Sequence, residues 1–274
     1  FYHHGKPSSH VQLGNIAART KRIRIGTAVA VLPWHNPIET AQDYATVDLL
    51  SDGRLDFGVG RGLFKGEFDG YGVPWAEAQE RFDENLDIIL KAWTSNGKFS
   101  YEGKFHSYPE LEFMPKPLQK PHPPLWQPAL SPSTLERCLS RDITPILGAS
   151  LTPLDDLKAA FAGLGAAMEK TGKTGMERVA HPFVYVSDTT EKARKEAREG
   201  MEWFLWDFAE MYDLPEGTEW PPSYAFFEGW ADYIRSLSYE QLVEDDLYEV
   251  KWKSALRGGR GWGITRERSD SGLS

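Results

Sequence analysis

The stretch GRLDFGVGRG, residues 53–62, decides the fold class, because it joins a turn, a short apolar strand and a glycine-rich strand end. Gly53 and Arg54 interrupt a helical pattern, and the apolar run that follows has the length of one buried strand in a parallel sheet. In a parallel α/β fold, the carboxyl end of such a strand faces the ligand crevice. The glycines there allow a ligand to approach the backbone, and Arg61 offers a guanidinium fork for an anion.

The glycine pattern does not match the standard nucleotide-binding motifs. A G-x-G-x-x-G fingerprint needs glycine at position 63, where this chain has Leu63, and no GxxxxGK[ST] loop is present. A tight turn that binds nothing accounts for the glycines as well as a ligand site does. The motif alone therefore leaves both interpretations open.

Strand-like and helical patterns alternate on both sides of this stretch. Upstream, KRIRIGTAVAVLP at residues 21–33 predicts a strand, and residues 37–51 predict a helix that opens with an Asn-Pro pair. Downstream, residues 77–94 have the periodicity of a long amphipathic helix, and residues 99–117 alternate aromatic and polar side chains as in a hairpin. Further strands are predicted at residues 124–129, 143–147 and 182–186, and further helices at residues 132–141, 153–171 and 191–211.

Alternation of this kind, with helical crossovers between strands, implies a parallel α/β sheet. We interpret residues 1–250, which contain five predicted strands, as a single domain. Residues 251–274 are rich in Arg, Gly and Ser and lack apolar periodicity, so we expect a disordered or non-homologous tail.

Composition and charge argue against several classes of protein. The chain has 274 residues, of which 41% are hydrophobic, enough for one sizeable core. A net charge of -9, from 31 basic and 40 acidic side chains, disfavours nucleic-acid binding. There is no run of about 18 apolar residues to predict a membrane span. The single cysteine, Cys138, fits a reducing compartment, so we expect a cytoplasmic protein. From the net charge and the lack of a long apolar run, we expect no nucleic-acid or membrane partner.

Two further segments carry candidate chemistry. Ser131 stands where it can cap a predicted helix, and the free N–H groups of a helix start form an anion site, although capping alone also explains the residue. His3 and His4 are adjacent, so on a strand end they point in opposite directions and suit a shared metal poorly. Neither belongs to a cluster with zinc spacing, and we expect no metal site. One of them could act as an acid or base near neutral pH.

Several segments, taken in order, together resemble the luciferase-like flavin-dependent monooxygenases. The resemblance covers residues 2–248 and implies a (β/α)₈ TIM barrel with its flavin at the carboxyl ends of the strands. The barrel is expected to be incomplete, because the family's first two strands precede its His-His pair and its last strand is not recognisable here. The segments are HHG at 3–5, PSS at 7–9, IAARTKRIRIGTAV at 16–29, LP at 32–33, HNP at 35–37, DLLSDGR at 48–54, GVGRG at 58–62 and PHPPLW at 121–126.

The resemblance also implies which residues contact the cofactor. His3 matches the family's catalytic histidine. The family's flavin ring lies along Thr27, Ala28 and Val29, where a non-proline cis peptide is frequent. The resemblance implies that Arg61, Arg81, Ser131 and Thr134 contact the cofactor phosphate. It also implies that Gly60 and Gly62 are among the cofactor-binding residues.

The activity implied is that of a monooxygenase that uses reduced FMN and O₂ on a small organic substrate. A separate reductase would supply the flavin, and the full-length protein would be a homodimer. Two alternatives remain: a deazaflavin-dependent oxidoreductase and a non-catalytic flavin-binding barrel. Gly60 stands where the bacterial luciferases have a reactive cysteine, and Tyr2 where they have a glutamate, so light emission is not expected.

Overall fold

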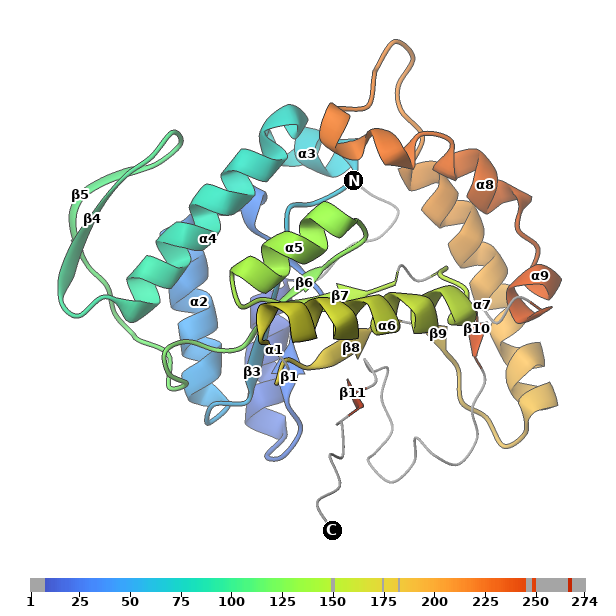
Figure 1. Cartoon of the computed structure of the whole chain (residues 1–274), viewed down its shortest axis with the longest axis horizontal. Coiled ribbons are helices and arrows are strands. Elements are labelled where there is room, and N and C mark those ends of the chain that lie inside the picture. Colours follow the sequence, from blue (N-terminus) through green and yellow to red (C-terminus); the bar gives the residue numbers. More distant parts are fainter. Residues whose placement is uncertain are drawn as a thin grey trace. The chain divides into compact units, whose positions relative to one another are not determined.

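The computed structural model describes residues 8–148, 151–173, 175–181 and 183–244, together with the pairs 248–249 and 266–267. The chain divides into two compact units. The first comprises Phe1–Gln127 with Glu216–Phe226, and the second comprises Pro128–Pro215 with Phe227–Ser274. Figure 1 labels the helices and strands of both.

A parallel sheet forms the core of the first unit. Its strands are β1 (Ile25–Gly26), β2 (Ala30–Val31), β3 (Leu55–Gly60) and β6 (Leu125–Pro128). Both β1 and β2 pair with β3, and β3 pairs in turn with β6. Every residue of β3 is buried, as expected for a strand covered on both faces.

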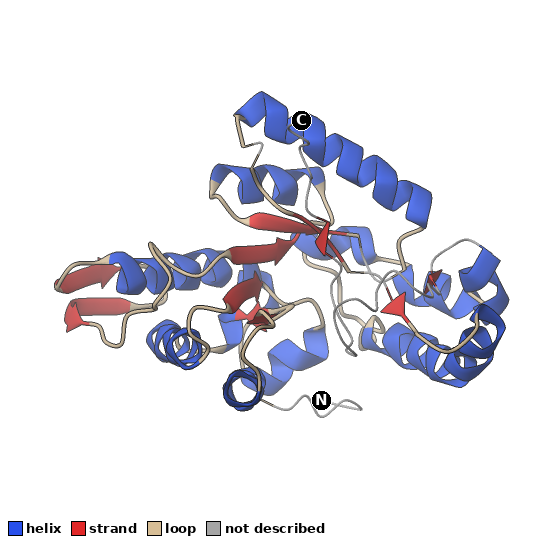
Figure 2. Ribbon diagram, turned by 90° about the horizontal axis from the view of Figure 1, so that it is seen from below, coloured by secondary structure: helices blue, strands red, loops and turns tan. Residues whose placement is uncertain are grey.

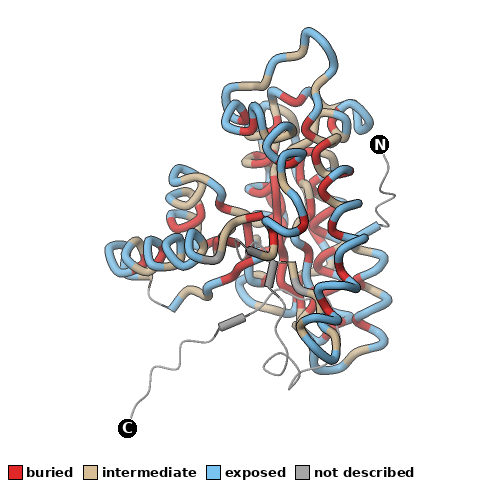
Figure 3. Tube along the Cα trace, turned by 90° about the vertical axis from the view of Figure 1, so that its right-hand side faces the viewer, coloured by how far each residue is buried: buried red, intermediate tan, exposed pale blue. Residues whose placement is uncertain are grey.

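Helices cover one face of this sheet. Phe57 of β3 contacts Tyr44 of α2 (Pro37–Leu50) and Trp93 of α4 (Ala78–Thr94), with ring centroids 4.4 and 5.2 Å apart. Figure 3 shows buried residues in the interior and exposed residues along the outer turns of the helices. The remaining elements of the first unit are α1 (Ser9–Arg19), η1 (Leu32–Trp34), α3 (Lys65–Tyr71) and η2 (Trp75–Glu77).

The strand predicted over residues 21–33 is interrupted. Gly26 pairs with Asp56 and Ala30 with Val59, so four steps on one side (26 to 30) match three on the other (56 to 59). One extra residue is therefore accommodated as in a β-bulge. The Thr27 hydroxyl donates to the Gly58 carbonyl at 2.7 Å, and a Cβ on Gly58 would lie 1.8 Å from the Thr27 carbonyl oxygen. Only glycine at position 58 permits this close approach.

The excursion predicted at residues 99–117 is a hairpin, as expected. β4 (Lys98–Glu102) pairs antiparallel with β5 (Ser107–Glu112). Its turn is anchored on Glu84 of α4, whose carboxylate accepts backbone N–H groups from Lys104, Phe105 and His106 at 2.7–2.9 Å. The two strands are distinct from the parallel sheet in Figure 2.

The second unit continues the alternation of parallel strands and helices. β7 (Thr144–Leu147) pairs in parallel with β8 (Arg178–Ala180), and the Ala129 N–H donates to the Ile146 carbonyl at 2.9 Å. β9 (Phe183–Val184) pairs in parallel with β10 (Tyr248–Glu249). The helices are α5 (Pro132–Ser140), α6 (Leu154–Thr171), α7 (Thr190–Met211), α8 (Trp230–Ser236) and α9 (Tyr239–Glu244), with η3 (Pro222–Phe227) spanning the boundary of the units.

The predicted parallel α/β organisation is thus confirmed in each unit. The strand predicted at residues 182–186 is represented by β9, and β8 precedes it as a separate strand. From the predicted tail, the structure describes Arg266–Glu267, which form β11 and pair antiparallel with β8. The rest of the tail lies outside the described residues. The helices described are all too short or too polar to cross a membrane.

Candidate functional site

Arg61 follows the last residue of β3 and is held by side chains and backbone of the first unit. Its Nη2 donates to the Ser223 carbonyl at 2.7 Å, and its Nη1 lies 3.5 Å from Oε1 of Gln79. The guanidinium carbon lies 4.0 Å from the centroid of the Tyr224 ring. The cation predicted to bind an anion is therefore oriented by groups from α4 and from a segment distant in sequence.

The glycines on either side of Arg61 are required by close packing. A Cβ on Gly60 would lie 2.4 Å from Cγ2 of Val29. Gly62 has φ of +82°, in the left-handed region that side chains disfavour, and a Cβ there would lie 2.9 Å from the Phe68 ring. These contacts bring the β1–β2 connection against the end of β3.

The β1–β2 connection contains the residues expected beside the flavin ring. The non-proline cis peptide that the family resemblance implied is present, between Ala28 and Val29. Thr27 is buried, Val29 is half-buried and Ala28 is exposed. Contact of these residues with a flavin stays a prediction.

Arg81 lies on the side of α4 that faces the hairpin. It forms an ion pair with Glu77, at 2.7 Å between Nη2 and Oε2, and its guanidinium carbon lies 4.2 Å from the Phe105 ring centroid. Gln79, which faces Arg61, is two residues away and hence about 200° around the helix axis. The contacts described thus give Arg61 and Arg81 different partners, and a phosphate-binding role for Arg81 stays a prediction.

Ser131 and Thr134 begin α5 in the second unit. The Ser131 hydroxyl accepts the Thr134 N–H at 3.2 Å, which confirms the predicted cap. The same hydroxyl lies 2.9 Å from the Thr134 hydroxyl and 3.1 Å from that of Ser133. Three hydroxyls therefore meet at the positive end of a helix, an arrangement suited to an anion with several acceptor oxygens.

The remaining candidates from the sequence are a catalytic histidine, a cysteine and a metal site. His3, the predicted catalytic residue, lies outside the described residues. Cys138 is fully buried, and burial raises the pKa of its thiol to about 12, so it is not a nucleophile at neutral pH. Within the part of the chain that the structure describes, no three His, Cys, Asp or Glu side chains gather as a metal site would require.

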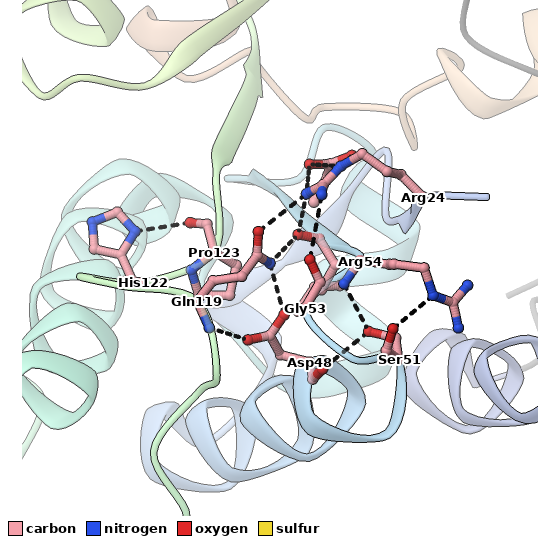
Figure 4. Close-up of polar contacts among 10 residues, drawn as sticks. Arg24, Asp48, Ser51, Gly53, Arg54, Gln119, His122 and Pro123 are labelled. Atoms are coloured by element: carbon pink, nitrogen blue, oxygen red, sulfur yellow. Dashed lines mark hydrogen bonds and ion pairs between the residues drawn. The ribbon is translucent and has the colours of Figure 1, made fainter. Parts of the chain in front are cut away.

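A polar network lies at the opposite end of β3 (Figure 4). The buried Asp48 carboxylate accepts the Gln119 backbone N–H at 2.9 Å and its side-chain amide at 2.7 Å. Arg24 donates to both carboxylate oxygens of buried Asp56. The Arg54 guanidinium donates to the Ser51 carbonyl at 2.6 Å. Because this network surrounds the amino end of the strand, we interpret it as structural rather than catalytic.

Sequence inspection missed Gln79, Ser223 and Tyr224. Tyr224 lies in an aromatic stretch that has no motif, and its partners Arg61 and Gly62 are 163 and 162 positions earlier (224 − 61 and 224 − 62). Nothing in the local sequence pairs residues so far apart. The one available signal was the unusual density of aromatic residues between positions 220 and 230.

Comparison with known proteins extends these findings. The family model for luciferase-like monooxygenases matches residues 1–256. The oxygenase component of the flavin-dependent trigonelline monooxygenase of Acinetobacter baylyi is 28% identical over 205 residues, covering 70% of this chain and 54% of the relative. The FMNH₂-dependent dimethylsulfone monooxygenase of Pseudomonas putida is 33% identical over 187 residues, covering 65% and 49%. The chain thus spans about half the length of these relatives.

Solved structures agree at the level of fold. The monooxygenase RslO1 of Streptomyces bottropensis superposes with a TM-score of 0.68 at 22% identity, covering 89% of this chain and 75% of that one. Together with the parallel β/α units described above, this likeness confirms the predicted fold class, an incomplete (β/α)₈ barrel.

Proposed function

Because the chain belongs to the luciferase-like monooxygenase family, we propose that it takes part in a flavin-dependent monooxygenase reaction using reduced FMN and O₂. The family match over residues 1–256 carries this proposal. The names of the two relatives support it, since one is called flavin-dependent and the other FMNH₂-dependent. The substrate is proposed to be a small organic molecule.

The donor set on the chain fits a flavin phosphate. Arg61 and Arg81 supply guanidinium N–H groups, which match phosphate oxygens in charge and geometry. Ser131 and Thr134 supply hydroxyls at the start of α5, where the helix dipole favours negative charge. From the family resemblance, we propose Arg61, Arg81, Ser131 and Thr134 as contacts of the cofactor phosphate. By the same resemblance, Thr27, Ala28 and Val29, together with Gly60 and Gly62, are proposed to contact the rest of the flavin.

Reduced flavin, when bound, supplies the reactivity toward O₂. The chain's own residues bind the phosphate, orient the ring and keep water from the reacting face. His3, by its match to the family's histidine, is proposed to hold or donate a proton near the ring. One relative is named an oxygenase component, which supports a separate reductase as partner. We further propose a cytoplasmic location and a homodimer for the full-length protein.

The proposal is tested by the rate at which bound reduced FMN is reoxidised. Protein and reduced FMN are mixed anaerobically and then exposed to air-saturated buffer, while absorbance follows the return of oxidised flavin. We expect reoxidation to be slower than that of free reduced FMN, because the bound ring is shielded from solvent. Equal rates, with binding demonstrated, would favour the non-catalytic flavin-binding barrel. Binding of a reduced deazaflavin in place of FMN would favour the hydride-transfer alternative.

A further inference from the structure

The segment Glu216–Phe226 belongs to the first unit, although residues 128–215 of the second unit separate it in sequence from Gln127. It contacts the loop after β3 and the helical turn η2. Trp220 packs on Trp75, with ring centroids 5.2 Å apart, and Tyr224 stacks on the same indole at 5.2 Å and 25° between planes. The segment is thus docked by aromatic packing at the end of the strand that carries Arg61.

Tyr224 is the most deeply buried residue of this contact, with 1% of its surface exposed. Its hydroxyl donates to the Gly62 carbonyl at 2.8 Å, so both its ring and its polar end are engaged. Burial raises the pKa of the Tyr224 phenol to about 12, so the hydroxyl remains a neutral donor at physiological pH. A side chain held at both ends is a rigid surface for its neighbours.

The Arg61 guanidinium is supported by this segment in two directions. The Tyr224 ring lies over the guanidinium at 4.0 Å, and the Ser223 carbonyl accepts from Nη2 at 2.7 Å. This contact is made through the face of the ring, which restrains the guanidinium by a cation–π interaction rather than by a hydrogen bond to an oxygen. A guanidinium has five N–H donors, so a contact of this kind is compatible with donation to a phosphate.

We propose that Tyr224 is a positioning residue, which orients Arg61 for the phosphate of the bound flavin. This inference rests on the proposed function and deepens it. A long arginine side chain loses conformational entropy when it binds an anion. The loss is smaller when the guanidinium is already restrained by a neighbouring ring. Tyr224 therefore increases affinity for FMN through Arg61, and it does nothing for a flavin that lacks the phosphate.

The test compares the dissociation constants of FMN and riboflavin, which differ only by the phosphate. In the wild-type protein, FMN is expected to bind more tightly than riboflavin. Tyr224→Leu removes the aromatic ring and is expected to weaken FMN roughly five- to thirty-fold, the range of a buried cation–π contact. Riboflavin affinity stays the same. Tyr224→Phe keeps the ring and should retain most of the preference for FMN.

A double-mutant cycle separates positioning from general damage. In an Arg61→Ala background, Tyr224→Leu should no longer change the FMN-to-riboflavin ratio, because the residue through which it acts is absent. Tyr212→Leu in the second unit is the matched control: Tyr212 is also a buried tyrosine, with 4% exposure. That control is expected to lower stability and to leave the FMN-to-riboflavin ratio unchanged.

Each result has a distinct meaning. If the wild type does not prefer FMN over riboflavin, the phosphate assignment of the proposed function fails, and this inference fails with it. If the wild type prefers FMN and Tyr224→Leu preserves the preference, the inference alone is wrong. A gain in FMN affinity in Tyr224→Leu would also overturn it, because Tyr224 would then compete with the phosphate for Arg61.

Discussion

Gly58 is the residue at which the β1–β2 connection comes closest to β3. Its substitution by alanine would place a Cβ 1.8 Å from the Thr27 carbonyl oxygen, which is backbone and cannot turn aside. We expect Gly58→Ala to destabilise the protein by about 1–3 kcal/mol or more, the range of overpacked cores. The midpoint and slope of urea unfolding give the value.

The matched control is Gly200→Ala on α7. A Cβ there meets nothing within 4 Å, and the position lies inside a helix. This variant should be stabilised by roughly 0.5–1 kcal/mol, because alanine favours helix over glycine. Equal effects of the two substitutions would show that the close approach at Gly58 is not what requires glycine.

Residue by residue, the sequence predicted the groups whose neighbours are local. Ser131 caps the helix that follows it, and the bond from the Thr134 N–H involves only three intervening steps along the chain. The surroundings of Arg61 were not predictable, because Ser223 and Tyr224 reach it through tertiary packing. The same holds for Gly58, whose role depends on a partner strand rather than on its own turn.

Among the elements, α5 allows capping and anion binding to be distinguished. Ser131→Asn and Ser131→Asp both keep a good N-cap, so the free energy of unfolding should change little in either. If a phosphate lies at this helix start, the aspartate repels it and the asparagine does not. We expect FMN affinity to fall at least ten-fold more in Ser131→Asp than in Ser131→Asn, roughly 1.4 kcal/mol of difference. Identical FMN titrations of the two variants would leave Ser131 with capping as its only role.

The hairpin β4–β5 depends on one carboxylate of α4. Glu84 is 9% exposed and accepts three backbone N–H groups from the turn. In Glu84→Gln an NH₂ group replaces one oxygen, so all three N–H groups lose a charged acceptor and at least one of them faces a donor instead. We expect a loss of about 1.5–3 kcal/mol in unfolding free energy, with faster hydrogen exchange at residues 104–106.

Glu80→Gln, one helical turn earlier, serves as the control for that measurement. Glu80 forms an exposed pair with Lys104, with both side chains about 60% exposed. Surface pairs of this kind contribute little to stability, so this variant should remain near the wild type. Comparable losses in the two glutamine variants would contradict the anchoring role of Glu84.

The helices were predicted well from the sequence, whereas the strands were predicted less well. Helical periodicity and caps such as Asn36, which accepts N–H groups from Ile38 and Glu39, are properties of contiguous residues. The predicted strand at residues 21–33 is divided because of an extra residue relative to β3, and its register is set by the partner. A short apolar run in the sequence does not indicate whether an extra residue will be accommodated between two paired segments.

For the whole molecule, the order and spacing of the motifs predicted both the family and the fold class. Both are confirmed by the family match and by likeness to a solved structure. The single domain predicted for residues 1–250 stays a prediction, and the contacts define two compact units. The homodimer also stays a prediction, for which light scattering of the full-length protein is the appropriate measurement. Assembly depends on surface complementarity, which a sequence pattern does not contain.

The central claim is that this chain binds a flavin through its phosphate, with Arg61 as the principal cation. The most direct test is anaerobic titration of the protein with reduced FMN and with reduced riboflavin, followed by fluorescence. A charged hydrogen bond contributes about 1.5–3 kcal/mol, so FMN should bind roughly 10- to 150-fold more tightly than riboflavin. Arg61→Ala should remove most of that preference. Equal affinities for the two flavins, or a preference for FMN that survives Arg61→Ala, would contradict the account.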